Sequence, residues 1–349
     1  MERCRTTGLV RMVEVLVTGG AGFIGSNFVR HALDRHADWH VTNLDKLTYA
    51  GRLENLHDIK DHPRHTFVHG DVADDAVAGP LARAAEIIIH FAAETHVDRS
   101  IMQAGDFIRT DVFGTFVLLE AARQAQKLRR FVQISTDEVY GNIPEGSSRE
   151  TDELKPRNPY SASKAGADRL AYSYFATYEL PVIITRASNN YGPYQFPEKV
   201  IPLFVTNAID DLSVPLYGDG HQVRDWLHVE DHCRAVDLLI DAGTNGEVYN
   251  VGGGNHIPNV ELTGRILRLA GKTDALIRHV PDRQGHDRRY SLDTSKLRSL
   301  GWSPETDFER GLAETVQWYI ENDWWWRPIK DSDPAFRSYY ESQYGSRRS

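Results

Sequence analysis

The chain has 349 residues, of which 41% are hydrophobic and 26% charged, and its formal net charge is −9. This length suits one large or two modest domains with a substantial core. The acidic balance, without a long basic block, argues against nucleic acid as the main partner. No apolar run approaches the roughly 18 residues that a membrane span requires, so we expect no membrane association.

The two ends of the chain are predicted to be extensions. Segment 1–12 is charged and has no apolar stretch, so we expect neither a secretory signal nor packed structure there. Residues 327–349 are polar and tyrosine-rich, and we expect a loosely packed tail. The run Trp324–Trp326 lacks a basic amphipathic helix, which favours packing inside the protein over a membrane interface. Cys4 and Cys233 are far apart and form no disulfide framework, which favours the cytoplasm.

Short β-branched or aromatic runs alternate with segments of helical apolar spacing through the first half of the chain. The predicted strands are Val13–Thr18, His40–Asp45, Thr66–Asp71, Glu86–Ala92, Phe131–Ser135 and Pro181–Arg186. The predicted helices are Phe23–His36, Phe107–Gln126 and Pro159–Tyr178. This alternation, with near-continuous apolar strands, predicts an α/β fold: a Rossmann-type doubly wound parallel sheet with helices on both faces.

From about Asn190 the texture changes, because prolines become frequent and strands shorten. Helical spacing persists at Val200–Asp210, Val229–Ala242, Val260–Ala270 and Phe308–Glu321. We expect a cofactor-binding domain over 13–190 and a smaller mixed α/β substrate region over 191–326, with some later segments returning to the first sheet.

The first strand runs into a glycine-rich turn that opens a helix. Gly19, Gly22 and Gly25 form G-x-x-G-x-x-G, and such glycines let a backbone approach a pyrophosphate at a helix N-terminus. Asp45 ends the second strand twenty residues later, where a carboxylate binds a ribose 2′-hydroxyl and repels a 2′-phosphate. The pattern therefore predicts a dinucleotide site for NAD rather than NADP, with Asp71, after the third strand, as an adenine contact.

Tyr160 and Lys164 lie one turn apart at the start of a predicted helix that Asn158 caps and Pro159 opens. Spaced i, i+4, their side chains share a face. An ammonium group near a phenol lowers the pKa of the tyrosine, as a base for an alcohol proton requires. Taken alone, such a pair is more often an ordinary surface pair. The glycine-rich turn and a strand ending in Ser135-Thr136 favour the catalytic interpretation.

Eight stretches carry a family resemblance over roughly residues 13–326: TGGAGFIGSNFV, NLDKLTYAG, HFAAETHVDRS, STDEVYG, PYSASKAGAD, RASNNYGPYQFPEKVIPLF, YGDGHQVRDWLHVEDH and DRQGHDRRY. In them the chain resembles the extended short-chain dehydrogenases/reductases, and most closely the dTDP-glucose 4,6-dehydratases. The resemblance implies bound NAD, a nucleotide-sugar substrate, and a homodimer paired through a four-helix bundle of 107–126 and 159–178. One departure is Gln284, where the family pattern has proline.

The resemblance also implies residue roles. Glu138 would take the C5 proton, Asp137 would protonate the C6 hydroxyl, and Thr136 would hydrogen-bond the C4 oxygen beside Tyr160. NAD contacts implied are Gly19, Gly22, Phe23, Ile24, Gly25, Asp45, Lys46, Leu47, Thr48, Asp71, Val72, Phe91, Ala92, Ala93, Thr95, Thr110, Tyr160, Lys164 and Asn190. Substrate contacts implied are Thr136, Asn189, Lys199, Val200, Pro215, Leu216, Tyr217, Arg224, Asn259, Arg283 and His286.

Other functions remain open at this point. A UDP-sugar epimerase or decarboxylase shares the fold but has no use for adjacent Asp137 and Glu138. In a GDP-mannose 4,6-dehydratase we expect serine before the glutamate. A non-catalytic NAD sensor has no need of the complete set of reactive residues. His228, Asp231, His232 and Cys233 lie close together, but their spacing matches no standard metal site and Asp231 suits a helix start, so no metal is predicted.

Overall fold

The computed structural model of the protein describes residues 11–283 and 285–345. The expectations for segment 1–12 therefore lie almost wholly outside the described residues, and those for Cys4 and Gln284 lie wholly outside them.

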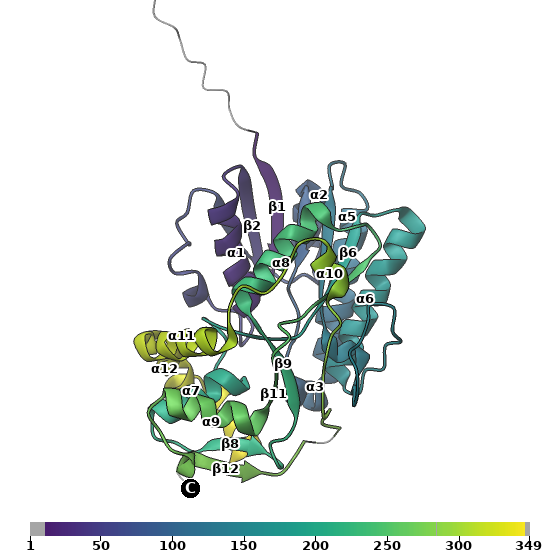
Figure 1. Cartoon of the computed structure of the whole chain (residues 1–349). Coiled ribbons are helices and arrows are strands. Elements are labelled where there is room, and N and C mark those ends of the chain that lie inside the picture. The colour runs from purple at the N-terminus through teal and green to yellow at the C-terminus, as the bar shows by residue number, and fades with distance from the viewer. Residues whose placement is uncertain (1–10, 284, 346–349) are drawn as a thin grey trace, which may run out of the picture.

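Seven parallel strands form the central sheet, in the order β10-β6-β5-β4-β1-β2-β3 (Figure 1). They are β1 (Val13–Thr18), β2 (Trp39–Asp45), β3 (His65–His69), β4 (Ile87–His90), β5 (Arg130–Thr136), β6 (Val182–Ala187) and β10 (Val248–Val251). The six predicted strands are all present, and the predicted doubly wound α/β fold is confirmed. The strand order reverses between β1 and β4, and such a switch point is where open α/β sheets bind ligands.

Successive side chains of a strand point to opposite faces of the sheet, so the apolar residues of each strand contribute to two separate cores, one on each face. Val15 and Val17 of β1 belong to one buried cluster, whereas Leu16 belongs to another. Helices α1 (Phe23–Arg35) and α8 (Val229–Ala242) cover the first face. Helices α2 (Asp75–Ala84), α5 (Gly114–Ala122) and α6 (Pro159–Tyr178) cover the other. Because helices cover both faces of the sheet, a ligand can reach it at the carboxyl ends of the strands.

The predicted helix Phe107–Gln126 is divided in the structure. Helices α3 (Val97–Met102) and α4 (Ala104–Phe107) precede a π-helical segment, Ile108–Phe113, and α5 ends at Ala122. The buried Asp111 lies in the π-helical segment, where its carboxylate accepts from the Ser163 hydroxyl at 2.6 Å and the Glu94 N–H at 2.9 Å. A π-bulge re-aims a side chain without ending the helix, and no apolar periodicity reports it.

The second region contains two small sheets. β7 (Asn189–Tyr191), β9 (Val223–His228) and β11 (His256–Pro258) form one, and β8 (Val214–Tyr217) with β12 (Ile277–Val280) forms the other. Helices α7 (Val200–Ile209), α9 (Asn259–Leu269) and α11 (Phe308–Glu321) pack around them, and α10 (Ser295–Ser299) lies near β10. Short 3₁₀ turns occupy Leu53–Leu56, Asp137–Tyr140 and Asp274–Leu276.

The prediction of a loosely packed C-terminal tail is wrong. Helices α12 (Asp323–Ser332) and α13 (Pro334–Tyr344) complete the core of the second region. Phe336, Tyr339, Tyr340 and Tyr344 recur at helical spacing and are all buried, so the tyrosines provide an apolar face. Trp325 and Trp326 are also buried, as expected, whereas Trp324 is exposed. Across the described ranges, no helix combines the length and apolar character needed to cross a membrane.

Candidate active site

The glycine-rich turn between β1 and α1 packs too tightly for side chains. Gly19 has a φ of 72°, and a Cβ there would lie 2.5 Å from the Ala92 nitrogen. A Cβ on Gly25 would lie 2.2 Å from the Gly19 carbonyl oxygen. Gly22 begins α1, and no side chain in the described part of the chain caps that end. The first helical N–H groups therefore face the cavity, as a helix that binds phosphate requires.

Asp45, at the end of β2, braces this turn. Its carboxylate accepts from the Ala21 N–H at 2.9 Å and from the Leu47 N–H at 2.8 Å. Burial raises the pKa of Asp45, and these two bonds oppose the rise. An ionised carboxylate has about four accepting positions, so two remain for ribose hydroxyls. Lys46 pairs with Asp71 at 2.8 Å at the same end of the cavity.

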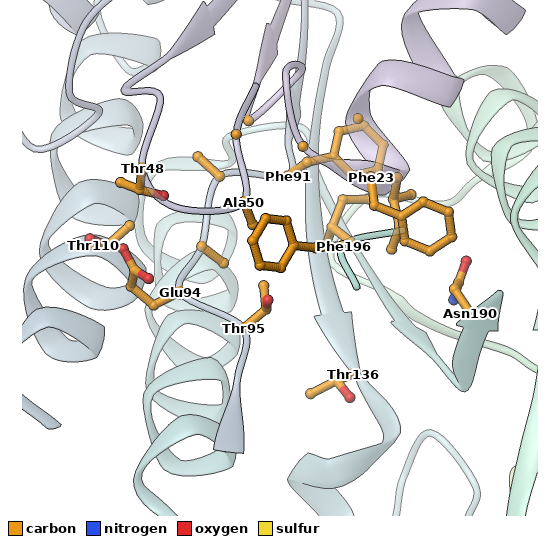
Figure 2. Close-up of a pocket in the computed structure, with 18 of the residues that line it drawn as sticks. Phe23, Thr48, Ala50, Phe91, Glu94, Thr95, Thr110, Thr136, Asn190 and Phe196 are labelled. Carbon is orange, nitrogen blue, oxygen red and sulfur yellow. The ribbon is translucent and has the colours of Figure 1, made fainter. Parts of the chain in front are cut away.

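A cavity of about 270 Å³ extends from the glycine-rich turn to the end of β5. Figure 2 shows Thr48, Glu94 and Thr110 on one side of it, Asn190 on another, and the ring of Phe196 between them. The residues expected to contact NAD all line this cavity, with one exception. Leu47 does not line it: its backbone is left-handed, with a φ of 54°, and only its N–H serves the site, through Asp45.

The residues of this cavity fit a dinucleotide. An uncapped helix N-terminus suits the pyrophosphate, and acids at the ends of β2 and β3 suit the ribose and adenine. At the far end, the Asn189 Oδ1 and Asp137 Oδ2 atoms are buried without a hydrogen-bond partner among the described residues. Buried polar atoms normally have partners, so these two are set for a ligand.

The reactive residues converge where β5 ends. The Thr136 hydroxyl accepts from the Glu138 N–H at 3.2 Å, and it is also 3.1 Å from Asp137 Oδ1. The chain then forms a single 3₁₀ turn, which places both carboxyl groups at the cavity. Adjacent residues of a strand would instead have pointed to opposite faces of the sheet.

The two carboxyl groups have different surroundings. Burial raises the pKa of Asp137 well above its ordinary value, and the neighbouring Glu138 adds to the rise. Burial also raises the pKa of Glu138, but Arg224, Lys199 and Arg283 oppose that rise. Asp137 is therefore the group that holds its proton more strongly, and Glu138 the group that more readily becomes a base.

Tyr160 and Lys164 are buried on one face of α6, which Asn158 begins with a capping box and Pro159 at its first turn, as predicted. The Lys164 ammonium donates to the Ile134 carbonyl at 2.6 Å. The expectation of a lowered tyrosine pKa is wrong for this state. Burial raises the pKa of Tyr160 well above its ordinary value, and the Glu138 and Asp111 carboxylates add to the rise.

A second cavity, of about 150 Å³, opens beside the first. Five residues line both cavities: Thr95, Glu138, Asn189, Glu198 and Lys199. All the expected substrate residues line the second cavity except Thr136, which lines the first. The Arg224 guanidinium lies over the Tyr290 ring at 4.4 Å, and that of Arg283 lies over the Tyr217 ring at 4.9 Å.

Sequence reasoning missed several residues of the two cavities. Glu94 and Glu198 line the first, and Tyr344 of α13 lines the second. Burial raises the pKa of Glu94 to about 7, with Asp111 and Asp106 adding to the rise. Glu94 stands directly after the Ala92-Ala93 pair expected at the cofactor, so its position alone could have suggested it.

The His228–Cys233 segment has a structural role. The N-cap of α8 is His228 rather than Asp231, whose carboxylate instead accepts from the Glu305 and Thr306 N–H groups at 3.1 Å each. Asp231 thus ties α8 to the loop before α11. Within residues 11–283 and 285–345, no group of three or more His, Cys, Asp or Glu side chains could hold a metal.

Known proteins that resemble this chain are consistent with a dinucleotide site of this geometry. The chain fits the family model described as GDP-mannose 4,6 dehydratase over residues 16–315. It is 53% identical to a dTDP-glucose 4,6-dehydratase of Streptomyces niveus, over 93% of this chain and 97% of that protein.

Two crystal structures are also similar. DesIV, a dTDP-glucose 4,6-dehydratase from Streptomyces venezuelae with NAD bound, superposes with a TM-score of 0.88 at 52% identity, covering 91% of this chain and all of that one. The dTDP-glucose 4,6-dehydratase of Bacillus anthracis in complex with NAD gives 0.85 at 47% identity, covering 91% and 99%. The chain therefore belongs to the nucleotide-sugar 4,6-dehydratase family, and within it to the dTDP-glucose 4,6-dehydratases.

Proposed function

We propose that the protein converts dTDP-glucose to dTDP-4-keto-6-deoxyglucose and water in an NAD-dependent, redox-neutral reaction. The observation that carries this function is the position of Glu138, which lies beside Asp137 and lines both cavities. A reaction that only oxidises or inverts C4 needs no such pair. Elimination of water across C5 and C6 needs both a base and an acid.

The oxidation half belongs to Tyr160, Thr136 and Lys164. Tyr160 takes the proton of the C4 hydroxyl while Thr136 hydrogen-bonds the same oxygen. When bound, NAD would supply the hydride acceptor for C4, the hydride donor for C6 and a positive charge that favours the phenolate. Lys164, held by the Ile134 carbonyl, adds positive charge one turn along α6.

The elimination half belongs to the carboxylate pair. The C4 ketone acidifies the C5 proton, which Glu138 removes, and the C6 hydroxyl leaves as water with a proton from Asp137. Burial raises the pKa of both groups, but their charged neighbours differ: Glu138 and Asp225 raise the pKa of Asp137 further, whereas Arg224, Lys199 and Arg283 oppose the rise at Glu138, which supports this division. When hydride returns to C6, Glu138 gives its proton back to C5. The proton that Tyr160 took from the C4 hydroxyl replaces the one that Asp137 gave to the leaving water, through solvent, so the net change is the loss of one water.

The nucleotide diphosphate is held in the second cavity. Arg224 and Arg283 provide donors that suit phosphate oxygens, and Lys199 lines both this cavity and the first. Asp287 and Tyr290 anchor Arg224: the Asp287 carbonyl accepts from it at 3.0 Å, and the Tyr290 ring lies against it. The other residues expected at NAD that line the first cavity are proposed to contact NAD, and the other expected substrate residues that line the second cavity are proposed to contact the nucleotide sugar.

The chain is proposed to act as a cytoplasmic homodimer. The surface around α5 and α6 carries large exposed apolar side chains, namely Ile101, Met102, Ile108, Phe113, Phe116, Tyr172 and Tyr178. A monomer seldom leaves such a patch in water, and a twofold four-helix bundle would bury it. The cytoplasm is supported by Cys233, which is buried and unpaired within the described residues.

Product analysis tests the function directly. Purified protein is mixed separately with dTDP-glucose, UDP-glucose and GDP-mannose, and the products are identified by mass spectrometry. Loss of water from dTDP-glucose, without reduced nicotinamide accumulating in solution, is the expected result. An epimerised UDP-sugar, or dehydration of GDP-mannose alone, would refute the proposal.

A further inference from the structure

One buried residue of the glycine-rich turn is held from outside the turn. The Ala21 carbonyl accepts from the Asn55 side-chain amide at 2.7 Å and from the Arg52 N–H at 2.9 Å. The Ala21 N–H donates to Asp45 at 2.9 Å. Both backbone polar groups of Ala21 are therefore fixed, the N–H by the acid expected at the ribose and the carbonyl by Asn55 and the Arg52 N–H.

Asn55 is itself fixed by the C-terminal part of the chain. The Trp325 indole N–H of α12 donates to Asn55 Oδ1 at 2.7 Å, although the two residues are 270 positions apart. Both side chains are 1% exposed. A continuous line of hydrogen bonds thus runs from Trp325 through Asn55 and Ala21 to Asp45. Figure 1 shows α12 beside α11 in the region below the sheet, distant along the chain from the turn between β1 and α1.

The direction of these bonds gives Trp325 a specific effect. An indole N–H can only donate, so it binds the oxygen of the Asn55 amide and leaves the NH₂ group aimed at the Ala21 carbonyl. Without the indole, the buried Asn55 oxygen loses its donor, and only the bond to the Ala21 carbonyl still orients the amide. A turn rich in glycine has high conformational freedom, so it depends on such external bonds for its shape.

We propose that Trp325 and Asn55 are positioning residues for NAD, through the glycine-rich turn. They contact no reacting atom, and neither lines the cavity of about 270 Å³. Instead they hold the backbone on which the cofactor lies, so the C-terminal helices take part in cofactor binding. This inference rests on the proposed function only in taking NAD as the ligand.

The test is NAD affinity of the nucleotide-stripped, full-length protein, measured by isothermal titration calorimetry. Trp325→Phe keeps the ring and removes the donor, and we expect Kd for NAD to rise on the order of tenfold, the change that about 1.4 kcal/mol produces. The matched control is Trp326→Phe. Trp326 is equally buried on the same helix, but its indole donates to the Tyr319 carbonyl at 2.7 Å. This control should lower the melting temperature similarly and leave Kd within about twofold of wild type.

A double-mutant cycle separates positioning from general destabilisation. Asn55→Ala should raise Kd for NAD at least as much as Trp325→Phe, and the double variant should be no worse than Asn55→Ala, because both act through one bond line. Equal Kd changes for Trp325→Phe and Trp326→Phe would overturn the inference, and so would multiplying effects in the cycle. Wild-type protein that binds NAD but does not dehydrate dTDP-glucose would overturn the proposed function alone.

Discussion

At the scale of single residues, Asp137 and Glu138 are neighbours whose surroundings separate their chemistry. Asp137 is buried and Glu138 is half-buried, and this loss of solvation disfavours the ionised form of each. Only Glu138 has three cationic side chains as the main opposing influence. The 3₁₀ turn after β5 allows both carboxyl groups to face one cavity. Two adjacent acidic residues thus have different roles because their surroundings differ: Asp137 is suited to act as the acid and Glu138 as the base.

The two half-reactions are expected to fail separately. Tyr160→Phe removes the base for the alcohol, so neither bound reduced nicotinamide nor product should form from dTDP-glucose. Glu138→Gln leaves oxidation possible, so reduced nicotinamide absorbance should develop on the enzyme while product formation falls roughly 10²- to 10⁴-fold. Stopped-flow absorbance and product analysis measure both. Near-normal product formation by Glu138→Gln would mean that the pair is structural.

Glu94 predicts a pH effect on stability. Its pKa is raised from 4.5 to about 7 by burial first and by Asp111 and Asp106 next. The folded state therefore retains a proton that the unfolded state loses, and this contribution to stability falls as pH rises from about 4.5 to 7. Glu94→Gln cannot ionise, so its free energy of unfolding should increase relative to that of the wild type as pH rises from about 4.5 to 7. Urea unfolding at several pH values measures the difference, and a constant difference would contradict the assignment.

At the scale of elements, α13 supports the wall of the second cavity. The Tyr339 hydroxyl and the Tyr217 hydroxyl both donate to Asp98 Oδ2, at 3.2 and 3.3 Å. Arg283 donates to the same oxygen at 3.2 Å and pairs with the other one. The buried Asp98 carboxylate therefore binds two residues of the second cavity, Tyr217 and Arg283, and also Tyr339 of α13.

Loss of one hydroxyl from α13 should therefore weaken substrate binding. Tyr339→Phe removes a donor from Asp98, and we expect the KM for dTDP-glucose to rise several-fold. This is less than the roughly tenfold or more that one hydrogen bond to a charged group is worth, because Tyr339 acts on the substrate only through Asp98. NAD retention and kcat should change little. Tyr249→Phe is the control, because its buried hydroxyl accepts from the Thr244 N–H at 2.9 Å outside both cavities. Equal KM values for the two variants would dissociate α13 from the substrate site.

At the scale of the whole molecule, the exposed apolar surface around α5 and α6, which includes the π-helical segment before α5, predicts assembly. Phe113 is 45% exposed and its ring lies 5.7 Å from that of Phe116. Phe113→Arg should convert the proposed dimer to a monomer at micromolar concentration, because it puts two arginines, one from each copy, into the apolar surface that the twofold contact would bury. Light scattering measures the mass. Leu269→Arg, at a site 41% exposed on α9, should leave the dimer intact. A wild-type monomer would end the proposal.

Local chemistry determined much of this protein by itself. Val13–Thr18 and Pro159–Tyr178 were predictable residue for residue, because apolar alternation, glycine after the strand, and Asn158-Pro159 before the helix are signals within a few positions. The same is true of the glycine-rich turn, Asp45 and the Thr136–Glu138 run. Each of these features is defined by residue types a few positions apart, so the sequence alone was enough to predict it.

Tertiary structure alone decided the rest. Helix α2 contains Gly79 and Pro80, and the covered sheet outweighs their poor helix propensity. The π-helical segment around Asp111, the pKa of Tyr160 and the indole bond from Trp325 to Asn55 depend on partners far along the chain. The tyrosines of α13 read as polar in sequence and became core, since burial depends on what the fold places opposite each ring. Periodicity records which face of a segment is apolar, but not which distant segment will cover it.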